Sequence, residues 1–435
     1  MLWLAGELPD GDGIRRDGRR QPDPLFRGAP HDDVGGRSPR YLAKFPRVDC
    51  GIRAAEVKGM PGFLPDRRSW LKTTGLAALG VATNSGCASG AVRFASSVSS
   101  RHRFARVLVS PERVIRTVTG LRPFRSSGFV VRAERRDPKV IIHNYGHGGG
   151  GVTLSWGTAH LALDEARQTG QRIAAVLGCG AIGLASARLL QRHGWTVTVY
   201  ARELPPDTTS NVAGAIWDPF SVFEENRLTA EFTAQFLRAA HVAYRAFQDL
   251  VGDYYGVRWI ENYAISSAPR VASRMDGELK DVIPDSRELT RDEHPFRADH
   301  VQRFASMLVE PSIYLAAVLR DFYLAGGHVV VQDFQSVEQI MALPEPVIVN
   351  CTGLGAKALF GDEELIPIKG QLCILLPQPE VDYTTLSDGF LYMMPRRDGI
   401  VLGGTHEFGV WDLTPDPVAT ARILAGNARL FRTRG

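Results

Sequence analysis

The chain has 435 residues, 44% of them hydrophobic and 23% charged, a composition typical of a globular protein with two or three domains. Disordered, collagenous and coiled-coil chains are excluded. Its 51 Lys and Arg residues nearly balance 47 Asp and Glu residues, so the net charge of +4 argues against a nucleic-acid-binding protein and favours a small-molecule partner. The five cysteines are scattered and form no CxxC pair, which argues against a disulfide framework and a metal site.

The N-terminal region is expected to contain a targeting signal rather than part of the folded domains. Residues 1–59 are rich in Gly, Pro, Arg and Asp, and we expect them to be disordered and to lie upstream of the true initiator, Met60. Residues 60–104 are expected to hold an export signal and a linker, because the run Asp66–Lys72 places an arginine pair before Trp, Leu, Lys and an apolar stretch, as twin-arginine signals do. The alternative is an arginine pair at the head of a short surface helix.

Export by the twin-arginine route would deliver the protein to the periplasm or cell envelope, with Cys87 as a candidate lipid anchor. If the arginine pair is not a signal, we expect a cytoplasmic protein. The apolar stretch after Lys72 is too short to cross a membrane.

A dinucleotide-binding fingerprint follows a predicted buried strand at 172–177. The strand leads into a GxGxxG turn, a helix over 184–193 and a second strand over 196–200, which together form a complete βαβ unit. The glycines allow a tight turn, close approach of a pyrophosphate and close helix packing, and the helix N-terminus offers N–H groups to phosphates. An ordinary glycine-rich turn is the alternative. The candidate cofactor-binding residues are Gly178, Gly180, Ala181, Ile182 and Gly183.

The segment after the second strand favours FAD over NAD. An NAD enzyme normally continues into a helix, whereas residues 201–217 form a polar, Thr-rich loop with two prolines. Glu203, which lies 20 residues after Gly183, is the candidate ribose ligand. The hydroxyl groups of this loop can bind phosphates, and a glycine leaves room for the flavin ring. The further candidates are Arg202, Thr208, Thr209, Ser210 and Gly214.

Five segments occur in a characteristic order along the chain: 178–217, 347–357, 368–371, 391–396 and 402–411. Together they resemble the D-amino-acid oxidase family of FAD enzymes. The resemblance implies an α/β fold, with a Rossmann-like FAD-binding domain on a parallel sheet and a substrate domain built on a mixed, largely antiparallel sheet.

Two further family segments lie ahead of the fingerprint instead of near the C-terminus. They are 119–125, with Gly-Leu-Arg-Pro, and 143–157, with His-Asn-Tyr-Gly-His-Gly-Gly. The chain therefore resembles a circularly permuted member, which predicts that its C-terminal helix over 417–431 ends close to residues 110–112. The expected domains are 105–220 as the FAD-binding core with permuted segments 106–166, 221–310 as part of the substrate domain, 311–360 as a return to the FAD domain, and 361–435 as the substrate-domain sheet and terminal helix.

The resemblance also assigns the site. It implies that Arg122 holds the carboxylate of the substrate by two hydrogen bonds, that the hydroxyl of Tyr392 is a second donor, and that the carbonyl of Gly149 accepts from the amine. Thr153, at the start of a helix, would stabilise negative charge on the flavin. The alternatives are a solvated arginine, a half-buried strand aromatic and a flexible glycine linker. The other residues implied along the flavin are Gly148, Gly151 and Val152.

Other polar residues of these segments receive lesser roles. Arg125 and Arg396 are expected at the surface or rim, and His143 and His147 are expected to be structural. His406 stands where some family members carry a pocket tyrosine, and it indicates a polar pocket.

The resulting hypothesis is an FAD-dependent D-amino-acid oxidase, which forms 2-oxo acids, ammonia and hydrogen peroxide from D-amino acids and oxygen. One alternative is a flavin dehydrogenase of the same fold that passes electrons to another acceptor. A second alternative is a non-catalytic module that binds flavin or D-amino acids.

Overall fold

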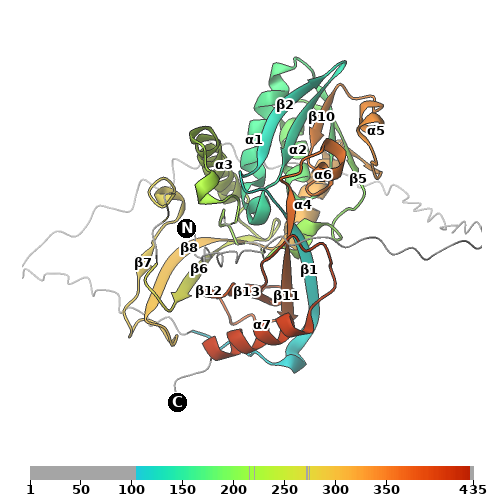
Figure 1. The fold of residues 1–435 in the computed structure, drawn as a ribbon. Helices are drawn as coiled ribbons and strands as arrows, with labels where there is room; N and C mark the ends of the chain where they lie inside the picture. The colour runs from blue at the N-terminus through green and yellow to red at the C-terminus, as the bar shows by residue number, and fades with distance from the viewer. Residues whose placement is uncertain (1–103, 215, 220, 271–272, 274, 432–435) are drawn as a thin grey trace, which may run out of the picture. The chain divides into compact units, whose positions relative to one another are not determined.

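The structure is a computed structural model, and it describes residues 104–431 apart from 215, 220, 271, 272 and 274. The expectations for residues 1–103, including Met60, the arginine pair and Cys87, lie outside the described residues. The described residues belong to one compact unit, and Figure 1 shows its two sheets with their helices.

One sheet, within the described residues, has six strands, and all but β2 run parallel. Its central strands are apolar and buried on both faces, as parallel strands between two helical layers must be. In spatial order the strands are β2 (Val130–Arg136), β3 (Lys139–Tyr145), β10 (Val347–Asn350), β4 (Ile173–Leu177), β5 (Thr196–Ala201) and β9 (His328–Val331).

Helices cover both faces of this sheet. Alternate residues of the strands point to opposite sides, so Val176 and Val349 join one hydrophobic cluster, while Ala175 and Ile348 join another. The first cluster includes residues of α1 (Gly151–Gln168), α2 (Ala181–Arg192), α3 (Ala230–Asp249) and α4 (Pro311–Leu324). The second includes residues of α5 (Val337–Met341) and α6 (Gly355–Phe360). The predicted βαβ unit around GxGxxG is observed as β4, α2 and β5.

The other sheet is mixed and largely antiparallel, as the resemblance implies, and β12 with β6 is its parallel pair among the described strands. Its strands, in spatial order, are β1 (Val114–Phe124), β11 (Ile366–Leu375), β14 (Gly399–Gly403), β13 (Leu391–Arg396), β12 (Tyr383–Ser387), β6 (Val257–Ser266), β8 (His300–Val309) and β7 (Arg287–Glu288), with β15 (Glu407–Phe408) paired to β11. The short 3₁₀ helices are η1 (Pro111–Arg113), η2 (Gly148–Gly150), η3 (Thr209–Val212), η4 (Glu225–Arg227) and η5 (Lys280–Val282).

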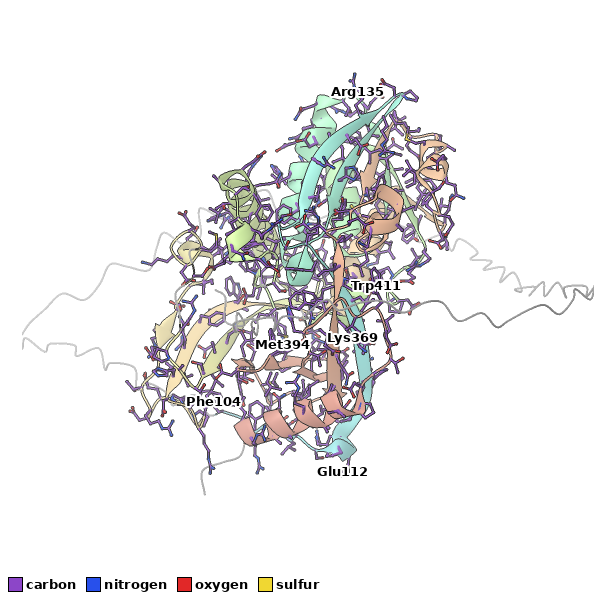
Figure 2. All side chains as sticks on the ribbon, viewed as in Figure 1. Phe104, Glu112, Arg135, Lys369, Met394 and Trp411 are labelled. Carbon is purple, nitrogen blue, oxygen red and sulfur yellow. The ribbon has the colours of Figure 1, made fainter. Side chains whose placement is uncertain are left out.

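Both ends of the described chain lie on the face of this second sheet that helix α7 (Pro417–Leu430) covers. This helix packs against β11, β13 and β14. In Figure 2 the end of α7 that leads to the C-terminus lies by Phe104, whereas Glu112, of the segment 110–112 expected there, is labelled toward the other end of the helix. Val107 and Phe431 are both buried in one hydrophobic cluster, and Phe104 packs against it. Figure 2 labels Phe104 on the side of the sheet that α7 covers.

Two elements lie elsewhere than the expected domain boundaries place them. Strand β1 falls within the range assigned to the FAD-binding core, but it pairs antiparallel with β11 from Val114 to Phe124 and so belongs to the second sheet. Helix α3 falls within the range assigned to the substrate domain, but it packs on α1, where a Cβ on Gly157 would clash with the carbonyl of Ala239. Long-range packing that local periodicity does not encode sets both positions.

Candidate active site

A cavity of about 1250 Å³ is lined by residues of both sheets. Met394 and Trp411 are among its lining residues and lie where the two sheets meet in Figure 2. The candidate site residues from the sequence all line this cavity: Arg122, Gly148, Gly149, Gly151, Val152, Thr153, Gly178, Gly180, Ala181, Ile182, Gly183, Arg202, Glu203, Thr208, Thr209, Ser210, Gly214 and Tyr392.

The glycine turn between β4 and α2 forms one part of the cavity. Gly178 has φ +107°, which favours glycine, and a Cβ on Gly183 would clash with the carbonyl of Gly178. Helix α2 therefore starts directly against β4, and its first-turn N–H groups lie at the cavity. The Oγ atom of Ser210 accepts a hydrogen bond of 3.0 Å from the N–H of Ala181, which ties the following loop to this helix end.

The loop after β5 continues the cavity wall. Arg202 and Glu203 form an ion pair of 3.1 Å with side chains 66% and 47% exposed, so both remain open to solvent. Thr208 donates a hydrogen bond of 2.8 Å to Oδ1 of Asn211 and precedes η3. The expected polar loop is thus observed. Ser210 ties it to the start of α2, and the hydrogen bond between Thr208 and Asn211 holds its turn.

A second glycine turn, η2, leads into α1. Gly148 has φ +53°, and a Cβ there would clash with the carbonyl of Ser221. That carbonyl accepts a hydrogen bond of 2.9 Å from the N–H of Gly149. Thr153 lies in the first turn of α1, where the helix dipole favours negative charge, and its Oγ1 donates to the carbonyl of Asp218 at 3.1 Å.

Arg122 and Tyr392 approach each other across two glycines. The spatial order β1, β11, β14, β13 places Gly370 and Gly403 on the strands between them. A Cβ on Gly370 would lie 2.5 Å from both terminal nitrogens of Arg122, and a Cβ on Gly403 would clash with the Tyr392 ring. The two side chains therefore lie over glycine backbone on one face of the sheet.

The chemistry of this pair suits a carboxylate. Burial raises the pKa of Tyr392, while the hydrogen bond and charge of Arg122 oppose that rise, so the hydroxyl stays protonated at neutral pH. Nη1 of Arg122 also donates to the carbonyl of Thr405 at 3.4 Å. A fixed guanidinium and a neutral hydroxyl donor present three hydrogen-bonding groups to one anion.

His406 lies near Arg122, but it is not among the residues that line the described cavity. Burial, and then the charge of Arg122, lowers the pKa of His406 to about 4, so the ring is neutral. The ring stacks on Phe390 at 4.6 Å and contacts Phe408 at 5.0 Å. His406 is thus part of an aromatic group, with Phe390 and Phe408, that lies near Arg122.

Two arginines expected at the surface or rim are held in ion pairs instead, Arg396 buried and Arg125 partly buried. The Arg396 side chain is 3% exposed, pairs with Asp398 at 2.7 Å and donates to the carbonyl of Ala213 at 3.0 Å. The Arg125 side chain is 15% exposed and pairs with Asp362 and Glu364. The partners are distant in sequence or at a turn, so composition alone could not place these side chains inside.

The histidines His143 and His147 make structural contacts. Nε2 of His143 lies 2.9 Å from Oε2 of Glu134. His147 stacks on Phe129 and lies 3.1 Å from Oγ1 of Thr158, and burial lowers its pKa to about 3. A neutral, packed imidazole orders the turn that η2 forms.

Asp218, which is not among the candidates from the sequence, lines the cavity beside Thr153. Its Oδ1 oxygen is buried and lacks a hydrogen-bond partner, and burial raises the pKa of Asp218 to about 7. The signal in the sequence is its isolation, because it is the one charged residue in the run Ala215–Phe220.

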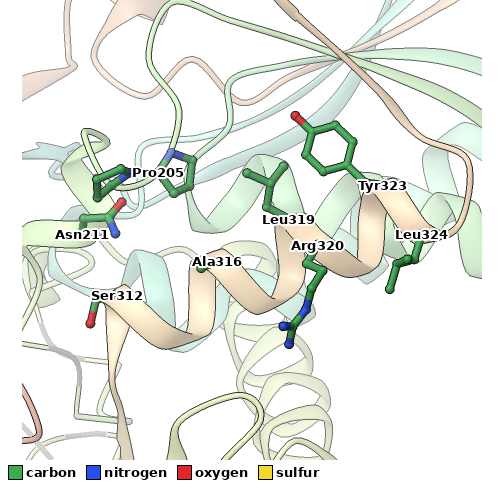
Figure 3. A pocket seen from close by; sticks show the side chains of 9 residues that line it. Pro205, Asn211, Ser312, Ala316, Leu319, Arg320, Tyr323 and Leu324 are labelled. Atoms are coloured by element: carbon green, nitrogen blue, oxygen red, sulfur yellow. The ribbon is translucent and has the colours of Figure 1, made fainter. Parts of the chain in front are cut away.

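A smaller hollow of about 340 Å³ lies along α4, between that helix and the loop after β5 (Figure 3). Leu319 and Tyr323 contribute much of its apolar lining. Its one charged lining residue, Arg320, stacks over the ring of Tyr254 at 4.3 Å. The larger cavity, with its glycine turns and polar groups, is therefore the candidate active site.

In the described part of the chain, helices long and apolar enough to span a bilayer are absent. Over the same residues, His, Cys, Asp and Glu side chains form no group of three or more that could hold a metal ion.

Features of the cavity fit FAD. Its volume exceeds the roughly 300–1,000 Å³ of most small-ligand sites, as a dinucleotide and a substrate together require. The N-terminus of α2 and its glycine turn can hold the pyrophosphate, and the N-terminus of α1 with Thr153 can face the flavin. The buried Oδ1 of Asp218 has no hydrogen-bond partner, which indicates that a polar ligand in the cavity supplies one.

Known proteins are similar to this chain over much of its length. D-amino-acid oxidase of Rubrobacter xylanophilus is 33% identical over 260 residues, which covers 58% of this chain and 74% of that protein. Human D-aspartate oxidase is 28% identical over 259 residues, covering 58% of this chain and 73% of that protein. Among solved structures, glycine oxidase from Bacillus cereus aligns with a TM-score of 0.46 and 16% identity, covering 60% of this chain and 78% of that one.

The sequence profile of the FAD dependent oxidoreductase family matches residues 66–165 and 174–434. The match spans the glycine turns, Arg122, Tyr392 and strands of both sheets of the described fold. The chain therefore belongs to the family of FAD dependent oxidoreductases, and its cofactor is FAD.

Proposed function

We propose that the protein is a D-amino-acid oxidase that converts D-amino acids to 2-oxo acids, ammonia and hydrogen peroxide. The observation that carries this proposal is the pairing of Arg122 with Tyr392 in the same cavity as the flavin-binding glycine turns. A carboxylate held there would present its α-carbon to the cofactor. The 33% identity to a D-amino-acid oxidase supports the choice of substrate and its handedness.

Each group of the chain has a distinct task in this proposal. Arg122 binds the substrate carboxylate by two hydrogen bonds, and Tyr392 donates a third. The carbonyl of Gly149 accepts from the amine, which fixes the α-hydrogen in one direction. FAD, when bound in this cavity, would supply the two-electron oxidation of the α-carbon, with oxygen as the final acceptor. The oxidised substrate is the imino acid, whose C=N bond water hydrolyses to give the 2-oxo acid and ammonia.

An anaerobic absorbance titration tests the proposal. Purified holoenzyme is mixed in turn with a panel of D-amino acids, their L forms and glycine, and the flavin band is followed. Bleaching by D forms, followed by peroxide on admission of air, is the expected result. Bleaching without peroxide would favour a dehydrogenase with another acceptor. A yellow protein that no amino acid bleaches would favour a binding module and contradict the oxidase.

We further propose that the family segments are circularly permuted in this chain and that residues 60–104 direct export by the twin-arginine route. The shared cluster of Val107 and Phe431 supports the first proposal, because an uninterrupted chain would join these ends. The arginine pair before the apolar stretch supports the second. Fusion of residues 60–104 to a reporter should give export that is lost when Arg67 and Arg68 are replaced by Lys.

A further inference from the structure

The carboxyl group of Asp218 has a position that the proposed tasks do not use. Its Oδ1 is buried and has no hydrogen-bond partner, and the residue lines the cavity. The segment that carries it is fixed on both sides. Met307 accepts from the N–H of Trp217 at 2.7 Å, and Ser306 donates to the carbonyl of Trp217 at 2.6 Å. The N–H of Asp218 itself donates to Thr153.

No charged group of the described chain compensates this carboxyl. The elements packed against its segment contribute His147 near η2 and Tyr244 of α3, which contacts Trp217 at 5.0 Å. Burial lowers the pKa of His147 and raises the pKa of Tyr244, so both are neutral near pH 7. Strand β8 contributes Ser306, Met307 and Leu308 there, none of which is charged. Arg122 and Tyr392 line the same cavity, but burial alone raises the pKa of Asp218 to about 7.

The segment lies against the turn that faces the substrate amine. Ser221, three residues after Asp218, accepts from the N–H of Gly149 at 2.9 Å, and Thr153 bonds to the backbone of Asp218 itself. An amino acid at neutral pH carries an α-ammonium, whose nitrogen has no free electron pair. The carbonyl of Gly149 can accept a hydrogen bond from this ammonium, but it cannot take its proton. A carboxylate in the same wall can.

We propose that the carboxylate of Asp218 accepts a proton from the α-ammonium of the substrate in this site. The inference rests on the function proposed above. One N–H bond breaks and one O–H bond forms, leaving a neutral amine and a neutral carboxylic acid. The freed electron pair on nitrogen then forms the C=N bond as the α C–H bond breaks and its two electrons pass to FAD. Asp218 later returns its proton to solvent.

The test compares Asp218→Asn with the unmodified holoenzyme during anaerobic flavin bleaching by D-alanine. The second-order rate of the unmodified enzyme should rise with pH and level off above about pH 7. Asp218→Asn should be roughly 100-fold slower at pH 7. Its rate should then rise tenfold per pH unit, approaching the unmodified enzyme once the substrate amine deprotonates in solution. Equal rates at pH 7 would overturn the proposal.

A binding experiment gives a readout without turnover. Benzoate, a carboxylate without an amine, should bind the unmodified holoenzyme more weakly above pH 7, because ionised Asp218 then faces an anion. The flavin spectrum reports this binding, and Asp218→Asn should remove the pH dependence. Unchanged pH dependence in the variant would place the titrating group elsewhere. If no D-amino acid bleaches either protein, the proposed function fails, while the benzoate result still reports on Asp218.

Two controls separate this role from folding and from a role toward the flavin. Asp299→Asn makes the same change at a side chain that is 87% exposed, and it should leave both pH profiles unchanged. Asp218→Glu keeps a titrating carboxyl and should restore part of the rate at pH 7; it also carries the test if Asp218→Asn loses FAD. If Asp218→Asn instead changes the pH slope of the flavin potential by about 30 mV per unit, one proton per two electrons, Asp218 serves the cofactor and the proposal is wrong.

Discussion

The proposed anchor for the substrate carboxylate depends on the shape of one side chain, that of Arg122. Arg122→Lys keeps the charge but loses the planar fork, so we expect kcat/KM for a D-amino acid to fall by roughly 10- to 100-fold, from the loss of about 1.5–3 kcal/mol of charged hydrogen bonding. Steady-state kinetics at saturating oxygen measure this, with flavin content as the check on folding. Arg116→Lys alters the same strand at a side chain 48% exposed and should change kcat/KM less than twofold. A similar loss in both variants would refute the anchor.

A second residue-scale prediction concerns stability. Arg396 and Arg116 share the partner Asp398, but the Arg396 side chain is 3% exposed and that of Arg116 is 48% exposed. Arg396→Met removes a buried guanidinium that bonds Asp398 and the carbonyl of Ala213, and it should lower the free energy of unfolding by about 1.5–3 kcal/mol. Arg116→Met should lower it by about 1 kcal/mol or less. Urea unfolding at one fixed FAD concentration compares the two, and equal losses would contradict the difference in burial.

At the scale of elements, the row Arg122, Gly370, Gly403, Tyr392 crosses four adjacent strands. Gly370→Ala would place a Cβ 2.5 Å from the guanidinium nitrogens, so the guanidinium must move while the backbone can stay. We expect KM for a D-amino acid to rise and kcat/KM to fall by up to roughly 100-fold, with FAD retained. Gly277→Ala adds a Cβ with no heavy atom within 4 Å and should be neutral. Unchanged kinetics in Gly370→Ala would show that the guanidinium does not sit over this glycine in solution.

Ion pairs connect the segments that join the two sheets. Arg125 follows β1 and pairs with Glu364, which precedes β11. Burial raises the pKa of Glu364, but hydrogen bonds from Ser127 and Ser126 and the charge of Arg125 outweigh this and hold the pKa below its usual value. The carboxylate therefore stabilises the fold above its usual pKa, and this stabilisation is lost as the pH falls through its lowered value.

Glu364→Gln should thus lower Tm at pH 6, and its effect should diminish as the pH falls below the usual pKa of a glutamate, because the stabilisation by the charge is progressively lost there. Thermal unfolding between pH 6 and pH 3 measures this convergence. Glu363→Gln changes a neighbouring side chain that is 86% exposed and should follow the unmodified protein throughout. A constant difference in Tm between Glu364→Gln and the unmodified protein at every pH would assign the effect to packing instead.

At the scale of the whole molecule, the arrangement of elements predicts tolerance to a new chain order. Val107 and Phe431 share a cluster, and the link between α1 and β4 is exposed around Gly170, which has φ +69° and no neighbour at its Cβ position. A chain that starts at Gln171, joins residue 431 to 107 by a short Gly/Ser linker and ends at Gly170 should fold and bind FAD. Flavin content and far-UV circular dichroism measure this. New ends inside β4 should prevent folding, and equal failure of both chains would contradict the prediction.

Much of the nucleotide-binding half is readable from local pattern. The strand, GxGxxG turn, helix and second strand follow from glycine positions and short-range periodicity, and the structure places them as β4, α2 and β5. The candidate site residues line one cavity, and they were identified from the glycine fingerprint and the family motifs. These features can be predicted because each depends on a few neighbouring residues or on a motif with fixed spacing.

Long-range pairing determines the rest. Contacts between residues far apart in the chain decide four features of the structure. They place β1 in the second sheet, remove Arg396 and most of Arg125 from solvent, set glycines beneath Arg122 and Tyr392, and leave Oδ1 of Asp218 buried without a partner. A residue type sets what a side chain can do, namely carry charge, donate a hydrogen bond or hold a proton. Whether it does so in water or against a buried partner is set when distant strands pack, because desolvation and approach distance exist only in the folded chain.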